Sequence, residues 1–131
     1  GEKVLDVELG EREEERRFAR GEERLKGLGL RVKPLTPDAS IKLGFTGELA
    51  EELGFGPEEK PVVVVKVDSL SQAAEKGIQV RDIITEIDQE RITSTQHFMR
   101  SISNLEKGRS ALFWLWRPDR GVDVRALRMT D

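Results

Sequence analysis

The segment Gly27-Leu28-Gly29-Leu30-Arg31-Val32-Lys33-Pro34 joins a glycine-rich turn to a run in which apolar and basic residues alternate. Glycine permits backbone conformations in which neighbouring N–H groups point to one spot, and such a cluster of donors binds an anion. The alternation over residues 28–33 predicts a strand, and the free edge of a strand can pair with an extended peptide. We therefore expect a terminal carboxylate to be held beside a strand edge that accepts a peptide.

Composition and charge narrow the class of protein. The chain has 131 residues, of which 36% are charged and 37% hydrophobic, which suits one modest domain with an appendage. Its 22 basic and 25 acidic residues do not resemble the basic footprint of a nucleic-acid binder. No apolar run approaches the ~20 residues that a membrane-spanning helix needs. The absence of cysteine excludes disulfides, thiolate catalysis and cysteine-bound zinc.

Two segments precede the glycine-rich turn. Residues 3–9 (KVLDVEL) are expected to form a short strand, and residues 11–26 are almost wholly charged. Because Phe18 and Leu25 are the only large apolar residues in the charged segment, we expect a solvated helical linker outside the core.

Downstream, short apolar runs alternate with residues that begin helices. Thr46, Ser71 and Ser94 are predicted to cap three helices, because a Ser or Thr oxygen accepts a hydrogen bond from the first turn. Thr36-Pro37-Asp38 is expected to be a turn. The expected strands cover residues 28–33, 62–67, 83–87, 111–117 and 122–127, and the expected helices cover 47–53, 72–76 and 95–106. Five or six short strands with two principal helices predict an α+β sandwich or partial barrel.

Two tryptophans mark one face of a predicted strand. Trp114 and Trp116 alternate with smaller apolar residues, so we expect them to face outward while their neighbours face the core. We expect this apolar patch to contact the N-terminal segment, a neighbouring domain or a second chain. The alternative is a core thick enough to bury both faces of the strand.

Read in order, these elements resemble a PDZ domain of the kind that follows the catalytic domain in HtrA (Deg-type) serine proteases. The resemblance covers residues 26–129. It rests on Gly27-Leu28-Gly29-Leu30 for the carboxylate-binding loop, Val62–Val67 and Asp68–Ile78 for a strand and a small Ser-x-Ala-Ala helix, Asp82-Ile83-Ile84 for a strand entry, Asp88–Ile92 for a hairpin and Thr95–Gly108 for the groove helix. It implies a PDZ-like partial β-barrel or sandwich of five to six short strands with two helices, preceded by a charged linker helix.

Four local features depart from the family pattern. Arg81 stands where the family usually has glycine, and Gln72 replaces a usual proline at the first helical position. Asp88-Gln89-Glu90 replaces an Asn-Gly turn, and residues 40–56 make a longer connection than the family leads us to expect. These departures bear on the geometry of single turns.

The resemblance also implies how the chain is divided. Its last predicted strand, 122–127, follows the groove helix, as in the circularly permuted bacterial type of PDZ domain. The sequence Asp6-Val7-Glu8 echoes Asp123-Val124-Arg125. We therefore expect residues 1–10 to be the remnant strand of a preceding, similar domain, residues 11–26 a charged linker, and residues 27–131 the second of two tandem PDZ domains.

The resemblance implies a peptide groove between the first strand and the long helix. Its carboxylate-binding residues map to Gly27, Leu28, Gly29 and Leu30, and its groove residues map to Val32, Thr95, Met99 and Ile102. Leu28, Leu30, Met99 and Ile102 would enclose an apolar terminal side chain. The alternative is that apolar residues such as Met99 and Ile102 simply belong to the hydrophobic core. Thr95, and not His97, is expected to face the ligand, which leaves His97 in solvent.

Catalytic and metal chemistry find little support. His97 is the only histidine, and no G-x-S-x-G motif is present, so a serine triad is not expected. Asp82, Glu86 and Asp88 share one face of a strand, but a hard-cation site needs more oxygen ligands from a curved loop. We expect a solvated strand face there, and no metal, cofactor or catalytic residue in the chain.

The expected function follows from the resemblance. The chain is expected to be a non-catalytic peptide-binding module of a periplasmic, trypsin-like HtrA serine endoprotease, serving substrate capture and regulation in protein quality control. Its expected partners are C-terminal or extended apolar peptides of substrates, and the protease and neighbouring PDZ domains of its parent. An adaptor for oligomer assembly, or a part of another extracytoplasmic processing or secretion machine, is the alternative.

Overall fold

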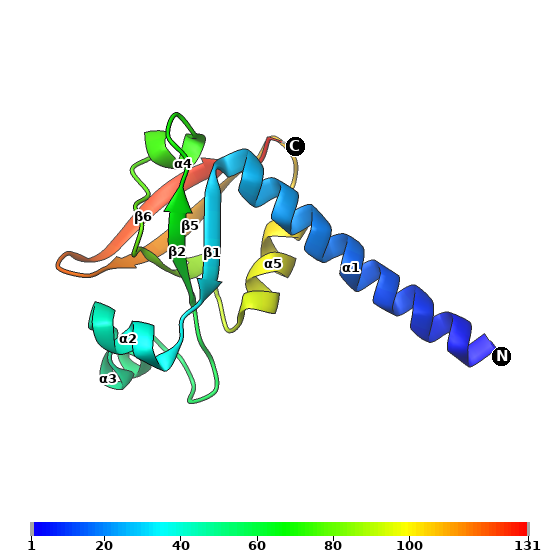
Figure 1. Cartoon of the computed structure of the whole chain (residues 1–131), viewed down its shortest axis with the longest axis horizontal. Coiled ribbons are helices and arrows are strands. Elements are labelled where there is room, and N and C mark those ends of the chain that lie inside the picture. Colours follow the sequence, from blue (N-terminus) through cyan, green and yellow to red (C-terminus); the bar gives the residue numbers. More distant parts are fainter. Residues whose placement is uncertain (1, 131) are drawn as a thin grey trace.

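The computed structural model describes the backbone of residues 2–130 and the side chains of residues 12–130 (Figure 1). The strands are β1 Leu30–Pro34, β2 Val62–Val67, β3 Ile83–Ile87, β4 Glu90–Arg91, β5 Ser110–Arg117 and β6 Gly121–Arg128. The helices are α1 Glu2–Leu28, α2 Pro37–Leu43, α3 Gly47–Glu52, α4 Gln72–Glu75 and α5 Thr95–Asn104. The expected α+β class is confirmed.

One antiparallel sheet organises the fold. Its strand order is β1-β2-β3-β5-β6, and the short β4 pairs with β3. β1 lies at one edge, so β2 is its only partner among the described strands. The predicted strands 62–67 and 83–87 agree with β2 and β3, because runs of Val and Ile suit a strand with buried faces.

The main core lies between the sheet and helices α1, α4 and α5. Its largest members are fully buried, among them Phe98, Phe113, Ile102 and Leu115. A second, smaller apolar cluster covers the opposite face of the sheet, where Leu35, Phe45 and Phe55 pack beneath α2 and α3.

The predicted alternation of Trp114 and Trp116 with core residues is confirmed, but the predicted partner of their outward face is wrong. Along β5 the core residues alternate with Trp114 and Trp116, which are half-buried on the other face. The ring of Trp116 meets Phe45 edge-on, with the centroids 5.5 Å apart. The connection between β1 and β2 therefore covers Trp116, which makes the sheet apolar on both faces at this point.

Helix α2 was not anticipated, because Thr36-Pro37-Asp38 reads equally well as a turn. In the structure the Thr36 hydroxyl accepts a hydrogen bond from the Ala39 N–H at 3.2 Å, and Pro37 is the first helical residue. A threonine cap followed by proline at the first helical position is the signal that identifies the helix. Gly44, with φ of +79°, ends it.

The departures from the family pattern leave the turn geometry in place. Arg81 adopts φ of +84°, a conformation that glycine reaches without strain. Asp88 and Gln89 also have positive φ, as the two central residues of a tight hairpin require. Gln72 gains a role that proline lacks, because its side-chain amide donates to the Arg128 carbonyl at 2.9 Å and ties α4 to β6.

The N-terminal prediction is wrong in its secondary structure. Residues 3–9 lie within α1 and not in a strand, and the helix continues through the charged linker to Leu28. A strand needs a neighbour to satisfy its backbone groups, whereas a helix satisfies them internally. Figure 1 shows α1 projecting from the body of the molecule at its N-terminal end and passing α5 before it meets β1.

Candidate functional site

The expected carboxylate-binding loop is not an open loop in this structure. Gly27 and Leu28 form the last residues of α1, and Gly29 ends the helix with φ of +85°. The Gly29 N–H donates to the carbonyls of Leu25 at 2.9 Å and Lys26 at 3.0 Å. The Gly29 N–H, one of the backbone donors that were expected to face a ligand, therefore serves the end of the helix, because amides in a last helical turn point back along it. Leu30 already belongs to β1.

The structure does bring the predicted groove residues together. Leu28, Leu30, Met99 and Ile102 are at most 6% exposed and belong to one apolar cluster, against which the half-buried Val32 packs. Thr95 is half-buried at the start of α5. The alternative that these residues belong to the core therefore holds in the observed conformation. The edge of β1 beside them carries the exposed side chains of Arg31 and Lys33.

Helix α1 covers this cluster by packing against α5. A Cβ placed on Gly21 would lie only 2.8 Å from the Met99 carbonyl oxygen, so the two helices touch at their backbones. Arg24 is 7% exposed, and its guanidinium donates to the carbonyls of Ile102 at 2.7 Å and Ser103 at 3.1 Å. Together these contacts place the last two turns of α1 over the C-terminal half of α5.

Sequence analysis missed Gly21 and Arg24, and it wrongly left Leu25 outside the core. Gly21, Arg24 or Leu25, and Leu28 are spaced three and four residues apart, which puts them on one face of a helix. That spacing was the available signal. The surrounding charge obscured it, because a buried arginine counts as solvated in any pattern based on composition.

His97 was expected to lie in solvent, but its ring is half-buried and hydrogen-bonded. Its Nδ1 accepts a hydrogen bond from the Thr93 N–H at 3.1 Å, which leaves the proton on Nε2, and this nitrogen contacts the Glu90 carboxylate. The ring therefore joins the hairpin at β4 to the first turn of α5 and has no serine partner among these contacts.

The acidic strand face is also different from the expected solvated one. Asp82 is 2% exposed and forms a two-point ion pair with Arg117, with distances of 2.9 and 3.0 Å. Asp88 accepts a hydrogen bond from the Leu112 N–H at 2.8 Å. Among the side chains of residues 12–130, no three acidic or histidine groups gather as a metal site would require. None of the described helices has the length and apolar character to span a membrane.

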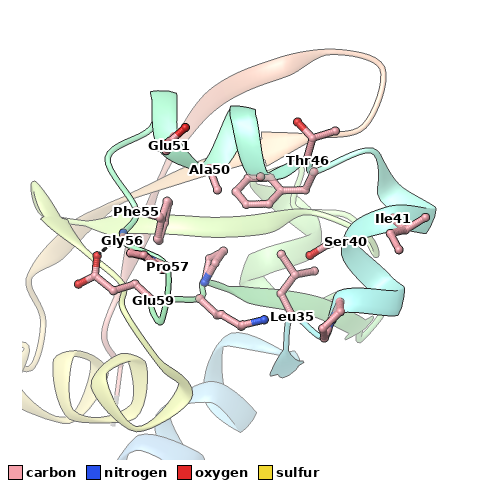
Figure 2. Close-up of a pocket in the computed structure, with 15 residues that line it drawn as sticks. Leu35, Ser40, Ile41, Thr46, Ala50, Glu51, Phe55, Gly56, Pro57 and Glu59 are labelled. Atoms are coloured by element: carbon pink, nitrogen blue, oxygen red, sulfur yellow. Dashed lines mark hydrogen bonds between the residues drawn. The ribbon is translucent and has the colours of Figure 1, made fainter.

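A hollow of about 970 Å³ opens between α2, α3 and the loop at residues 56–61 (Figure 2). Leu35, Phe45 and Phe55 form its apolar lining, and Glu51 and Glu59 lie at its border. Leu35, which directly follows β1, lines this hollow, but none of the predicted groove residues does.

Comparison with known sequences identifies the family. Residues 27–126 match the PDZ domain family, and this range covers most of the chain. The chain belongs to the PDZ domain family. This PDZ domain is 25% identical over 97 residues to a probable periplasmic serine endoprotease, DegP-like, of Brucella suis biovar 1, which covers 74% of the chain and 17% of the relative. A protein with the same description from Chlamydia pneumoniae is 29% identical over 80 residues, or 61% of the chain and 14% of the relative.

Solved structures agree with this assignment. The HtrA-type protease AlgW with a decapeptide matches 79% of the chain and 28% of its own length, with 25% identity and a TM-score of 0.57. The HtrA3 PDZ domain bound to a phage-derived ligand shares the fold, with a TM-score of 0.55, 18% identity and coverage of 77% and 82% of the two chains. The chain is thus a PDZ domain homologous to those of HtrA and DegP proteases, and it spans less than a fifth of the curated relatives it matches.

Proposed function

We propose that this PDZ domain binds the C-terminal residues of extended peptides along the edge of β1. The observation that carries the proposal is the open edge of β1 beside an apolar cluster that contains Leu30, Met99 and Ile102. A strand edge supplies backbone hydrogen bonds to any sequence, and an apolar cluster selects the terminal side chain. Solved AlgW structures that carry a decapeptide or a tripeptide support the proposal.

The carboxylate would bind to backbone N–H groups at Gly29 and Leu30. These donors suit a carboxylate better than a neutral amide, because hydrogen bonds to charged groups contribute about 1.5–3 kcal/mol each. The role requires the last turn of α1 to open, since the Gly29 N–H is bonded within the helix. After the cost of this opening, we expect micromolar affinity.

The experiment compares peptides that end in Val, Leu or Phe as the free acid and as the amide, by isothermal titration calorimetry. Amidation should weaken binding about ten- to a hundredfold. A free-acid peptide of the same length that ends in Asp is the control for the apolar terminal side chain. Equal affinity of acid and amide forms would refute carboxylate recognition.

We further propose that the module belongs to a longer periplasmic serine endoprotease of the HtrA type and serves substrate capture and regulation there. The support is the description of its relatives as periplasmic DegP-like endoproteases, of which it matches the non-catalytic PDZ portion. Its partners would then include the protease domain and a neighbouring PDZ domain. Its position after another PDZ domain stays a prediction from the sequence echo alone.

A second candidate function is a structural adaptor whose groove holds a segment of its own parent chain. The specific observation in its favour is that α1 already covers the apolar cluster. This candidate predicts that free C-terminal peptides do not bind at any accessible concentration, so the same titration separates the two functions.

A further inference from the structure

We infer that the last two turns of α1 compete with the peptide for one site, so that a peptide binds only when these turns leave α5. The inference rests on the proposed peptide-binding function and concerns its regulation. Three contacts carry it: the close approach at Gly21, the buried guanidinium of Arg24 and the helix end at Gly29.

The first contact is a helix crossing that only glycine allows. A Cβ on Gly21 would lie 2.8 Å from the Met99 carbonyl oxygen and 3.4 Å from the Met99 Cε. Met99 is one of the residues expected to enclose the terminal side chain of a peptide, and it is 4% exposed beneath this crossing. The helix therefore lies where it limits access to that residue.

The second contact supplies hydrogen-bond donors to the carbonyl groups at the C-terminal end of α5. The last carbonyls of a helix have no partner within the helix, and the helix dipole makes this end attractive to a cation. Arg24 donates to the carbonyls of Ile102, Ser103 and Leu105, which lie in the last turn of α5 and just beyond it. This arrangement anchors α1 through one side chain, so loss of that anchor loosens the whole contact.

The third contact makes the two states mutually exclusive. The Gly29 N–H bonds to the carbonyls of Leu25 and Lys26 while α1 is complete, so it is not available to a carboxylate at the same time. Gly29 also has φ of +85°, and a Cβ there would lie 2.1 Å from the Ser71 Cβ, so glycine is required where the helix meets β1.

The outer part of the helix makes the competition reversible. Residues 12–20 are all exposed, so the buried part of the contact between α1 and α5 begins at Gly21, although Phe18 still lies beside Met99 and Arg100 at the border of a shallow hollow. Molecules in which α1 covers the site cannot bind peptide, so the apparent affinity falls in proportion to the fraction that is open. Conversely, a bound peptide favours the state in which α1 is released. The position of the segment upstream of Gly21 would therefore control peptide affinity.

The test uses two alanine substitutions in the same helix. Gly21→Ala places a methyl group against Met99, whereas Arg20→Ala changes an exposed side chain at the neighbouring position. Alanine suits a helix at both positions, but only the first substitution also forces α1 away from α5. We expect Gly21→Ala to bind a free-acid peptide about tenfold more tightly than the unaltered chain, and Arg20→Ala to bind it with unchanged affinity.

Amide hydrogen exchange by NMR gives a second readout on the unaltered chain. Addition of the peptide should remove protection from residues 22–29 and leave α5 protected. Peptide binding with full protection of residues 22–29, or equal affinity of the two variants, would overturn the competition and leave the proposed function standing. Failure of the unaltered chain and of Gly21→Ala to bind any free-acid peptide would instead refute the proposed function, and the competition with it.

Discussion

At the scale of single residues, the buried ion pair between Asp82 and Arg117 has the largest expected effect on stability. Both side chains are at most 4% exposed, and Asp82 also accepts the Gln79 N–H at 2.9 Å. Removal of one member of such a pair leaves a poorly paired buried charge and costs up to about 3–5 kcal/mol, even though the Asp123 carboxylate remains 3.5 Å from Arg117. We expect Asp82→Asn to lower the free energy of unfolding by that amount in a urea titration. Asp119→Asn, at an exposed position with positive φ, is the matched control and should change little.

A substitution at Arg81 is expected to have the opposite effect, a gain in stability. Its φ of +84° is unfavourable for any residue with a Cβ, and its side chain is exposed. We expect Arg81→Gly to raise the free energy of unfolding by about 0.5–1 kcal/mol, because relief of backbone strain outweighs the added freedom of the unfolded chain. Arg120→Gly, also exposed but without positive φ, should lower the stability, and a loss of stability in both variants would contradict the argument.

Glu59 predicts a dependence of stability on pH. The pKa of this carboxyl lies below its usual value of 4.5, because it accepts the Gly56 N–H at 2.7 Å and lies beside the Arg91 guanidinium at 3.0 Å. A depressed pKa stabilises the folded state above the unfolded value, and this contribution is lost as the pH falls below 4.5. We expect Glu59→Gln to lower the urea midpoint at neutral pH, and the difference from the unaltered chain to shrink as the pH falls below 4.5. A constant difference between the two proteins at all pH values would argue against this origin.

At the scale of elements, α1 divides into an exposed part and a core part. The described residues before Gly21 are exposed, whereas Arg24, Leu25 and Leu28 are buried. The expectation that residues 11–26 form a solvated linker outside the core is therefore wrong from Gly21 onward. The expectation failed because of Arg24. The aliphatic stem and the hydrogen-bonded guanidinium of an arginine can be buried together when carbonyl acceptors are near.

Truncation tests this division. Removal of residues 1–16 should lower the melting temperature by less than about 3 °C, since only exposed side chains are lost among those described. Removal of residues 1–25 also removes Leu25 and the Arg24 anchor, and the melting temperature should fall by more than about 10 °C. Differential scanning calorimetry of the two variants is the measurement. Similar melting temperatures would mean that the contact between α1 and α5 contributes little to stability.

At the scale of the whole molecule, the contacts of the one histidine bear on the prediction that the chain has no peptidase activity. The Nδ1 of His97 accepts the Thr93 N–H and its Nε2 faces Glu90, so neither nitrogen activates a serine. We expect no cleavage of casein by the purified chain. Any trace of cleavage should persist in His97→Ala, which would assign it to a contaminant. Activity that disappears in this variant would contradict the absence of catalysis.

The sequence alone determined the elements whose signals are local. Strand periods, the capping residues Thr46, Ser71 and Ser94, and the two faces of β5 depend on neighbours within a few positions, so they could be predicted. The order of these elements was enough to indicate the PDZ family. The positive φ at Arg81 also agrees with the family pattern, because PDZ domains of this type usually have glycine there, although an arginine disfavours that conformation.

Only the tertiary structure decided the state of the candidate site. The anchor at Arg24 acts on residues 78 and 79 positions away, and no local pattern records which carbonyls lie within reach of a charged side chain. The same holds for Asp82, whose partner Arg117 is 35 positions away. A short-range pattern predicts which face of an element is apolar, but whether that face meets solvent, a ligand or another helix depends on packing across the chain. For this reason Leu28, Leu30, Met99 and Ile102 were correctly grouped from the sequence, while the inclusion of Leu28 in α1 and the packing of this helix over the other three were not foreseen.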